Sequence, residues 1–203
     1  MTRHHFTFLA LGDSYTIGES VPLHENFPYQ TVQLLRKNNL HFNAPEIIAK
    51  TGWTTFELAE HILHTKLNEH YDFVTLLIGV NNQYRQLSVE DYKADFEFLL
   101  KKAIHFAAEK NDHVIVLSIP DWGTTPFAKD KNSQKIAEEI DAFNAINKNI
   151  SAMYKVHYVE ITESTRSVIK DISLVTADGL HYSGKEHAKW AEKIALIIES
   201  IIK

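Results

Sequence analysis

A chain of 203 residues is long enough to bury a sizeable hydrophobic core, and we expect a single domain over residues 1–203. The absence of cysteine excludes disulfide bonds, thiolate catalysis and thiolate metal sites. A formal net charge of −5 disfavours nucleic acid and anionic membranes as partners. No apolar stretch approaches the length of a membrane span, so we expect no stable membrane association.

The first candidate site follows the first apolar run of the chain. Residues 6–11 have the character of a buried strand and lead directly into Gly12-Asp13-Ser14, whose small polar residues turn the chain. Open α/β sheets bind ligands at the carboxyl ends of their strands, so Ser14 is a candidate nucleophile, although many serines in such turns only cap a helix. The run leaves no room for a cleavable leader, and we expect a cytoplasmic protein.

Beyond Ser14 the sequence alternates between predicted helices and strands. We expect helices at 27–37, 54–67, 88–106, 136–153 and 183–202, strands at 46–49, 72–78, 113–119 and 156–161, and loops at 79–85 and 120–127. Thr54 with Glu57, and Ser183 with Glu186, have the spacing of capping boxes at helix starts.

Five strands joined by helices predict a parallel sheet, because parallel neighbours need crossover connections and these place helices on both faces. We therefore predict a three-layer α/β/α fold with a five-stranded parallel sheet. The natural strand order for five such strands is the flavodoxin-like one.

Groups suited to ester hydrolysis gather at the predicted ligand edge of this sheet. Ser14, Gly52 and Asn81 follow the first three strands, and Asp178 and His181 lie just before the last helix. A serine esterase needs a hydroxyl nucleophile, an imidazole base, a carboxylate that orients the imidazole, and donors for the oxyanion. A glycine between Asp178 and His181 allows a tight curl that brings the two side chains together. Gly52 can offer a backbone N–H, and Asn81 a side-chain amide.

The blocks that carry this pattern are Gly12-Asp13-Ser14-Tyr15, Gly52, Gly79-Val80-Asn81-Asn82 and Asp178-Gly179-Leu180-His181. In them the chain resembles the SGNH hydrolases, the superfamily of GDSL-type esterases and lipases. The resemblance implies Ser14 as nucleophile, His181 as base and Asp178 as its orienting acid. It also implies an oxyanion hole formed by the backbone amides of Ser14 and Gly52 and the Asn81 side chain. The implied activity is carboxylic ester hydrolysis, as in an acetylesterase or lysophospholipase, with no metal or organic cofactor.

Three residues depart from the family pattern. Tyr15 replaces the leucine of GDSL, Asn82 replaces an aspartate, and Tyr182 stands where many members have proline. None of these changes removes a group that does chemistry, but together they leave the subfamily and the substrate open.

Other titratable residues near these blocks are weaker candidates. Asp13 is interpreted as a turn residue, with Asp178 preferred as the acid. His187 is placed inside the last helix, away from its apolar stripe, and is not preferred as the base. His61 and His64 are interpreted as a surface pair and not as metal ligands.

The substrate is the least defined part of the prediction. Trp53, Tyr84, Arg85 and Trp122 flank the expected site and are candidate substrate-binding residues. With no amphipathic cap in the sequence, we expect a small-molecule ester with a short acyl chain, bound by a monomer or weak dimer. Two alternatives remain open: a noncatalytic carbohydrate-binding relative of the esterases, and a flavodoxin-like protein that binds FMN at the Ser14 turn. The second leaves the predicted acid and base without a role.

Overall fold

The computed structural model describes residues 5–203. The expectation that the chain has no cleavable leader rests in part on residues 1–4, which lie outside this range. The strands are β1 (Phe8–Gly12), β2 (Glu46–Ala49), β3 (Phe73–Leu77), β4 (Val114–Leu117) and β5 (His157–Val159). The α-helices are α1 (Ser14–Ile17), α2 (Phe27–Lys37), α3 (Thr55–His64), α4 (Val80–Tyr84), α5 (Val89–Phe106), α6 (Ser133–Met153), α7 (Thr162–Arg166) and α8 (Gly184–Ile202). Single 3-10 turns lie at 23–25, 111–113, 122–124, 126–128, 167–169 and 172–174.

The five strands form one parallel sheet in the order β2-β1-β3-β4-β5. This confirms the predicted flavodoxin-like order. In the register, Gly12 at the end of β1 lies opposite Ala49 of β2 and Leu77 of β3. The three strands therefore end at the same edge of the sheet, and the loops that follow them leave the sheet side by side.

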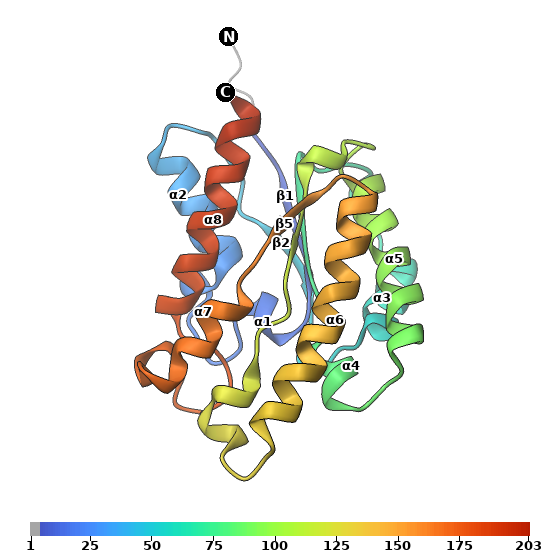
Figure 1. Ribbon diagram of the computed structural model, residues 1–203. Coiled ribbons are helices and arrows are strands. Elements are labelled where there is room, and N and C mark those ends of the chain that lie inside the picture. Colours follow the sequence, from blue (N-terminus) through green and yellow to red (C-terminus); the bar gives the residue numbers. More distant parts are fainter. Residues whose placement is uncertain (1–4) are drawn as a thin grey trace.

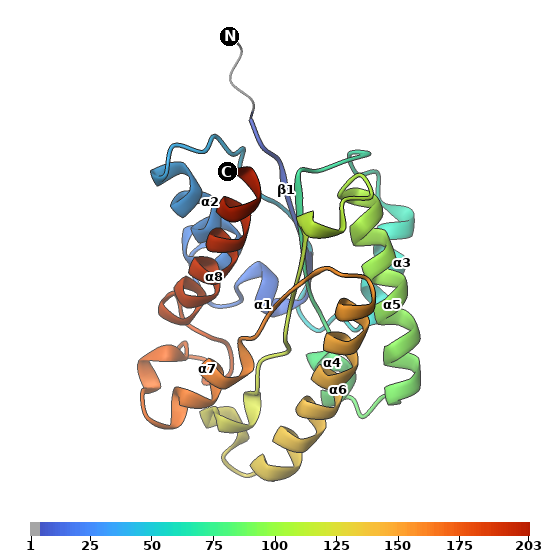
Figure 2. The same cartoon turned by 45° about the horizontal axis from the view of Figure 1, so that its top comes forward.

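Helices cover both faces of this sheet. Helices α2 and α8 pack together on one face, while α3, α5 and α6 cover the other, as both views show (Figures 1 and 2). Every residue of β1, β3 and β4 is buried, which explains why these strands consist mainly of apolar residues. In the described part of the chain, no helix combines the length and the apolar character needed to cross a bilayer.

The main differences from the predicted elements lie in the loops. The turn at Ser14 and the segment after β3 are short helices, α1 and α4, and not loops. The loop predicted at 120–127 contains 3-10 turns. Helix α3 ends at His64, short of the predicted end at residue 67. Helices of four or five residues are too short to show an apolar periodicity, so the sequence pattern could not reveal them.

Only one of the two predicted capping boxes forms. At α3 the Thr54 side chain accepts from the Glu57 amide, and the Glu57 carboxylate accepts from the Thr54 amide. At α8 the Ser183 side chain makes no cap hydrogen bond, so that prediction was wrong. Glu186 is instead fully buried, where its carboxylate accepts hydrogen bonds from Trp190 and Lys189. The Ser183 amide donates instead to the Leu174 carbonyl oxygen, and Glu186 pairs with residues of its own helix.

Candidate active site

A sharp corner at the end of β1 presents Ser14. Gly12 makes this corner possible, because a Cβ there would lie 2.1 Å from Thr16 Oγ1 and 2.4 Å from the Leu77 carbonyl oxygen. Asp13 is the N-cap of α1, and its Oδ1 accepts a hydrogen bond of 3.0 Å from the Tyr15 amide. Burial raises the pKa of Asp13 to about 7 despite this hydrogen bond. Ser14 thus occupies the first position of a short helix whose start is fixed by its neighbours.

The loop before α8 holds an acid and an imidazole in contact. His181 Nδ1 lies 2.7 Å from Asp178 Oδ2, as the predicted curl requires, and Gly179 between them has a φ of +75°. Asp178 Oδ1 accepts from the amides of Leu180 at 2.8 Å and His181 at 3.0 Å, and from the Thr176 hydroxyl at 2.8 Å. Although partial burial acts to raise the pKa of Asp178, these hydrogen bonds and others from Ser20 and the His181 ring hold it well below its usual range. Asp178 is therefore a carboxylate of fixed orientation.

The loops after β2 and β3 hold each other in place. Asn81 Nδ2 donates to the Trp53 carbonyl oxygen at 2.9 Å, which uses one of the two N–H groups of the amide and leaves the other for a ligand. Arg85 Nη2 donates to the Gly52 carbonyl oxygen at 2.6 Å. Asn82 accepts from the Thr55 amide at 3.0 Å and donates to the Thr55 hydroxyl at 2.8 Å. Gly52 and Asn81 are thereby fixed beside each other.

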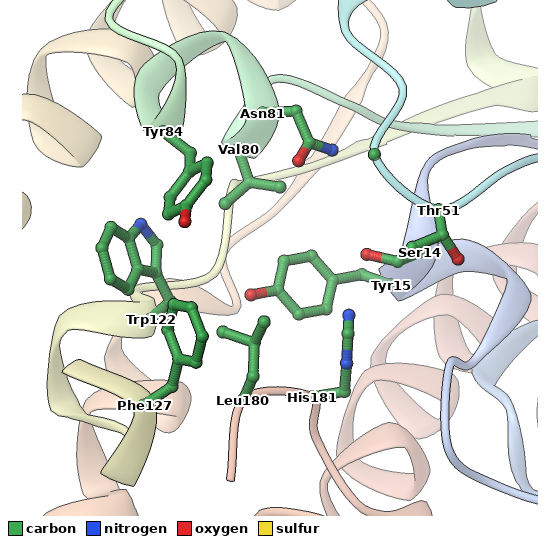
Figure 3. A pocket seen from close by; sticks show the side chains of 11 residues that line it. Ser14, Tyr15, Thr51, Val80, Asn81, Tyr84, Trp122, Phe127, Leu180 and His181 are labelled. Atoms are coloured by element: carbon green, nitrogen blue, oxygen red, sulfur yellow. The ribbon is translucent and has the colours of Figure 1, made fainter. Parts of the chain in front are cut away.

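These segments surround one pocket of about 170 Å³. Its lining residues are Ser14, Tyr15, Thr51, Gly52, Val80, Asn81, Tyr84, Trp122, Phe127, Leu180 and His181. Figure 3 shows Ser14, Thr51 and His181 on one side of it and a cluster of Tyr84, Trp122 and Phe127 on the other. In the cluster, the ring centroids of Tyr84 and Trp122 are 5.4 Å apart, and those of Trp122 and Phe127 are 6.0 Å apart. One wall of the pocket therefore carries polar groups, and the opposite wall is apolar and aromatic.

Most of the residues singled out in the sequence meet in this pocket. Ser14, Gly52, Asn81 and His181 line it, and Asp178 lies behind His181. Tyr84 and Trp122 are in its wall, as expected of substrate-binding residues. Among residues 5–203, no hydrogen bond joins the Ser14 hydroxyl to the His181 ring. Contacts of this kind are often long in the free enzyme and tighten with substrate.

The other two predicted substrate-binding residues lie beside the pocket and not in its wall. The Trp53 ring packs against His61, with ring centroids 4.7 Å apart, and its carbonyl oxygen receives the Asn81 amide. The Arg85 guanidinium spans the Gly52 carbonyl oxygen and the Glu57 carboxylate. Both residues contact the backbone around the pocket, and their contact with substrate stays a prediction.

Residues 10–189 match the model of the GDSL-like lipase/acylhydrolase family. The chain belongs to this family. The resemblance to the SGNH hydrolases is thereby confirmed, and membership places the chain among the hydrolases of ester substrates.

Solved structures share the fold of this GDSL-like hydrolase over almost its whole length. TesA has a TM-score of 0.76 at 16% identity, with 96% of this chain and 98% of TesA covered. Axe2, an acetylxylan esterase from Geobacillus stearothermophilus, has a TM-score of 0.73 at 18% identity, with 98% and 96% covered. A lipase/acylhydrolase from Enterococcus faecalis has a TM-score of 0.72 at 18% identity, with 96% of each chain covered. No curated protein matches the sequence.

Several residues around the pocket of this GDSL-like hydrolase were not foreseen. Thr51, Val80, Phe127 and Leu180 line it, and the Ser20 hydroxyl donates to Asp178 at 2.7 Å. Each of the four lining residues is next to a predicted residue or shares a loop with one. Their position beside predicted site residues could therefore have identified them from the sequence. No local pattern pointed to Ser20, because its partner Asp178 lies 158 residues further along the sequence.

His187 differs from its prediction because it is buried. Its Nδ1 accepts a hydrogen bond of 3.1 Å from the Phe27 amide, and its ring packs on Trp190 with centroids 4.6 Å apart. His187, Trp190, Ala191 and Ile194 have the i, i+3, i+4, i+7 spacing of a helix face, so His187 belongs to the apolar stripe. Burial, with a smaller contribution from the charge of His181, lowers the pKa of His187 to about 3.

We expect this histidine to make the fold sensitive to acid. An unfolded histidine titrates near pH 6.5, so between that pH and about 3 the unfolded chain binds a proton that the folded chain does not. His187 therefore makes the free energy of unfolding decrease as the pH falls, by about 1.4 kcal/mol per pH unit across that range. In His187→Asn, the side-chain oxygen can still accept from Phe27 but no longer titrates. Urea unfolding of both proteins between about pH 6 and pH 4 should give a shallower pH dependence for the variant. Equal slopes would contradict this assignment.

Proposed function

We propose that this GDSL-like hydrolase is a serine esterase that cleaves carboxylic esters with small or short acyl groups through an acyl-enzyme on Ser14. The observation that carries the proposal is the His181 imidazole, which is held by Asp178 at 2.7 Å and lines the same pocket as Ser14, Gly52 and Asn81. This set contains each group that acyl transfer through a serine needs.

The reaction follows from these positions. The Ser14 hydroxyl attacks the ester carbonyl carbon while His181 Nε2 takes its proton, and Asp178 keeps the Nδ1–H tautomer and stabilises the imidazolium. The backbone amides of Ser14 and Gly52 and the free N–H of Asn81 donate to the oxyanion. His181 then gives its proton to the departing alcohol. Water attacks the acyl-enzyme by the same route and releases the acid and free Ser14.

The pocket also supports the preference for small acyl groups. Its volume is about 170 Å³, and the Tyr84, Trp122 and Phe127 side chains stand opposite Ser14 and limit its depth. Apolar side chains at that wall suit an acyl chain. One protein with this fold is named an acetylxylan esterase, an enzyme for a small acyl group.

Hydrolysis of p-nitrophenyl acetate, butyrate and octanoate by the wild-type protein and Ser14→Ala tests the proposal. We expect the wild-type protein to hydrolyse the short esters fastest, and the variant to lose about 10⁴-fold or more of kcat. A fluorophosphonate should add to the wild-type protein at Ser14, as seen by mass spectrometry of its peptides, and should not add to the variant. If both folded proteins are equally inert and unlabelled, the esterase proposal fails and a ligand-binding role takes its place.

A further inference from the structure

The segment after α1 contacts three separate parts of the candidate site. We call residues 18–20 the strap. The backbone amides of Gly18 and Glu19 donate to the Ser14 carbonyl oxygen at 3.1 and 3.0 Å. The Thr51 hydroxyl, next to Gly52, donates to the Glu19 carboxylate. The Ser20 hydroxyl donates to Asp178 Oδ2 at 2.7 Å. The strap thus joins the nucleophile, the Gly52 loop and the acid.

The Ser20 hydroxyl donates to only one of the two carboxylate oxygens of Asp178, namely Oδ2. Oδ1 receives the Thr176 hydroxyl and the amides of Leu180 and His181. Oδ2 receives the His181 ring and Ser20. Ser20 therefore shares the oxygen that holds the imidazole, and it supplies the hydrogen bond that anchors this oxygen from outside the acid's own loop.

The backbone at Ser20 shows that this placement is enforced. Its φ is +66°, in the left-handed region that glycine adopts freely and other residues rarely adopt. A non-glycine residue keeps such a conformation only where its surroundings determine it. Glycine would adopt this backbone conformation more easily than serine. Serine provides a hydroxyl, which donates a hydrogen bond to Asp178.

We propose that Ser20 is a positioning residue for the acyl transfer, a role that rests on the proposed esterase function. Its hydroxyl fixes the rotation of the Asp178 carboxylate and draws electron density from Oδ2, which moderates how strongly the carboxylate holds the imidazole proton. Through the strap it also sets the distance between the base and α1, which carries the nucleophile. Asp178, Tyr15 and His187 are the titratable side chains around His181, and a change at Ser20 removes none of the three.

Three variants test this role on p-nitrophenyl acetate. Ser20→Ala and Ser20→Gly both remove the hydroxyl, but only glycine relieves the left-handed backbone. We expect both to lower kcat by about tenfold with little change in KM, since displaced catalytic groups lose rate and not binding. The acidic limb of the kcat/KM profile should move to higher pH, because Oδ2 then holds the imidazole proton more tightly. Thr51→Val breaks the other end of the strap without touching the acid, and should lower kcat without moving this limb.

Ser173→Ala is the matched control, because Ser173 also donates to an aspartate, Asp171, at 2.6 Å but lies outside the pocket. It should keep the wild-type kcat and pH profile. Wild-type kcat in Ser20→Gly would show that alanine acts through backbone strain and would overturn the proposal. An unmoved acidic limb in both Ser20 variants would also overturn it. If the wild-type protein itself neither hydrolyses the ester nor takes the phosphonate label at Ser14, the esterase function fails, which is a separate result.

Discussion

Asp178→Asn is expected to lower kcat by about 10⁴-fold while the protein stays folded, as loss of the orienting acid does in serine hydrolases. The reason lies in the hydrogen bonds of the carboxylate. Oδ1 accepts from three donors, those of Thr176, Leu180 and His181, so the NH₂ group of an asparagine cannot occupy that position. It must take the place of Oδ2 and donate to His181 Nδ1. The proton of the neutral imidazole is then forced onto Nε2, and His181 can no longer accept the proton of Ser14.

Steady-state hydrolysis of p-nitrophenyl acetate measures the loss, and ¹⁵N NMR of the histidine rings reports the change of tautomer. Asp171→Asn is the matched control, because Asp171 is an acid of the same loop whose partners are Lys185 and Ser173. Its kcat should remain close to that of the wild-type protein. Substantial turnover in Asp178→Asn with an Nδ1–H imidazole would remove Asp178 from the proposed triad.

The second large effect is expected from Asn81→Ala, with kcat lower by about 10²- to 10³-fold and a small change in KM. The amide keeps one N–H free of the Trp53 carbonyl oxygen, and in the proposed mechanism this N–H donates to charge that develops only in the transition state. The substrate carbonyl gains little from it in the ground state. Initial rates over a range of substrate concentrations separate the two kinetic constants.

The neighbouring asparagine supplies the control for this variant. Asn82→Asp also removes an amide, but a carboxylate can still accept from the Thr55 amide, and it gives up only the bond that Asn82 donates to the Thr55 hydroxyl, which itself donates to Asp95. Aspartate is also the residue that the family pattern has at this position. We expect kcat of Asn82→Asp to stay near that of the wild-type protein. A similar loss in both variants would point to disruption of the loop and not to a missing oxyanion donor.

The sequence was sufficient for the parallel sheet, whereas the strand order did not follow from periodicity and was confirmed as the natural order for five such strands. Residues 73–77 and 114–117 are short apolar runs whose burial in a parallel sheet follows from their composition, and helices between them dictate the crossovers. The residues at which each strand begins and ends were harder to predict from the sequence. Phe6, for example, belongs to the apolar run but pairs with Phe42 in an isolated bridge outside β1. The extent of a ladder depends on its neighbour, which the local sequence does not contain.

The same distinction applies to the candidate site. The residues with local signals were found, because Ser14, Gly52 and Asn81 each follow a strand and strand ends meet at one edge of the sheet. Contacts over long sequence distances were not found, such as that of Ser20 with Asp178. For His187 the helical spacing was visible in the sequence, and the prediction was wrong because a polar residue was assumed to face solvent.

The groups that would perform the chemistry come from opposite ends of the chain. Ser14 follows the first strand, whereas His181 precedes α8, which packs on α2 partly through the contact of His187 with Phe27. During synthesis on the ribosome, the serine therefore emerges long before the imidazole that would activate it. A serine hydroxyl without its base is a weak nucleophile. In the proposed mechanism, hydrolysis of esters therefore begins only when His181 has been made and the helix that follows it has docked.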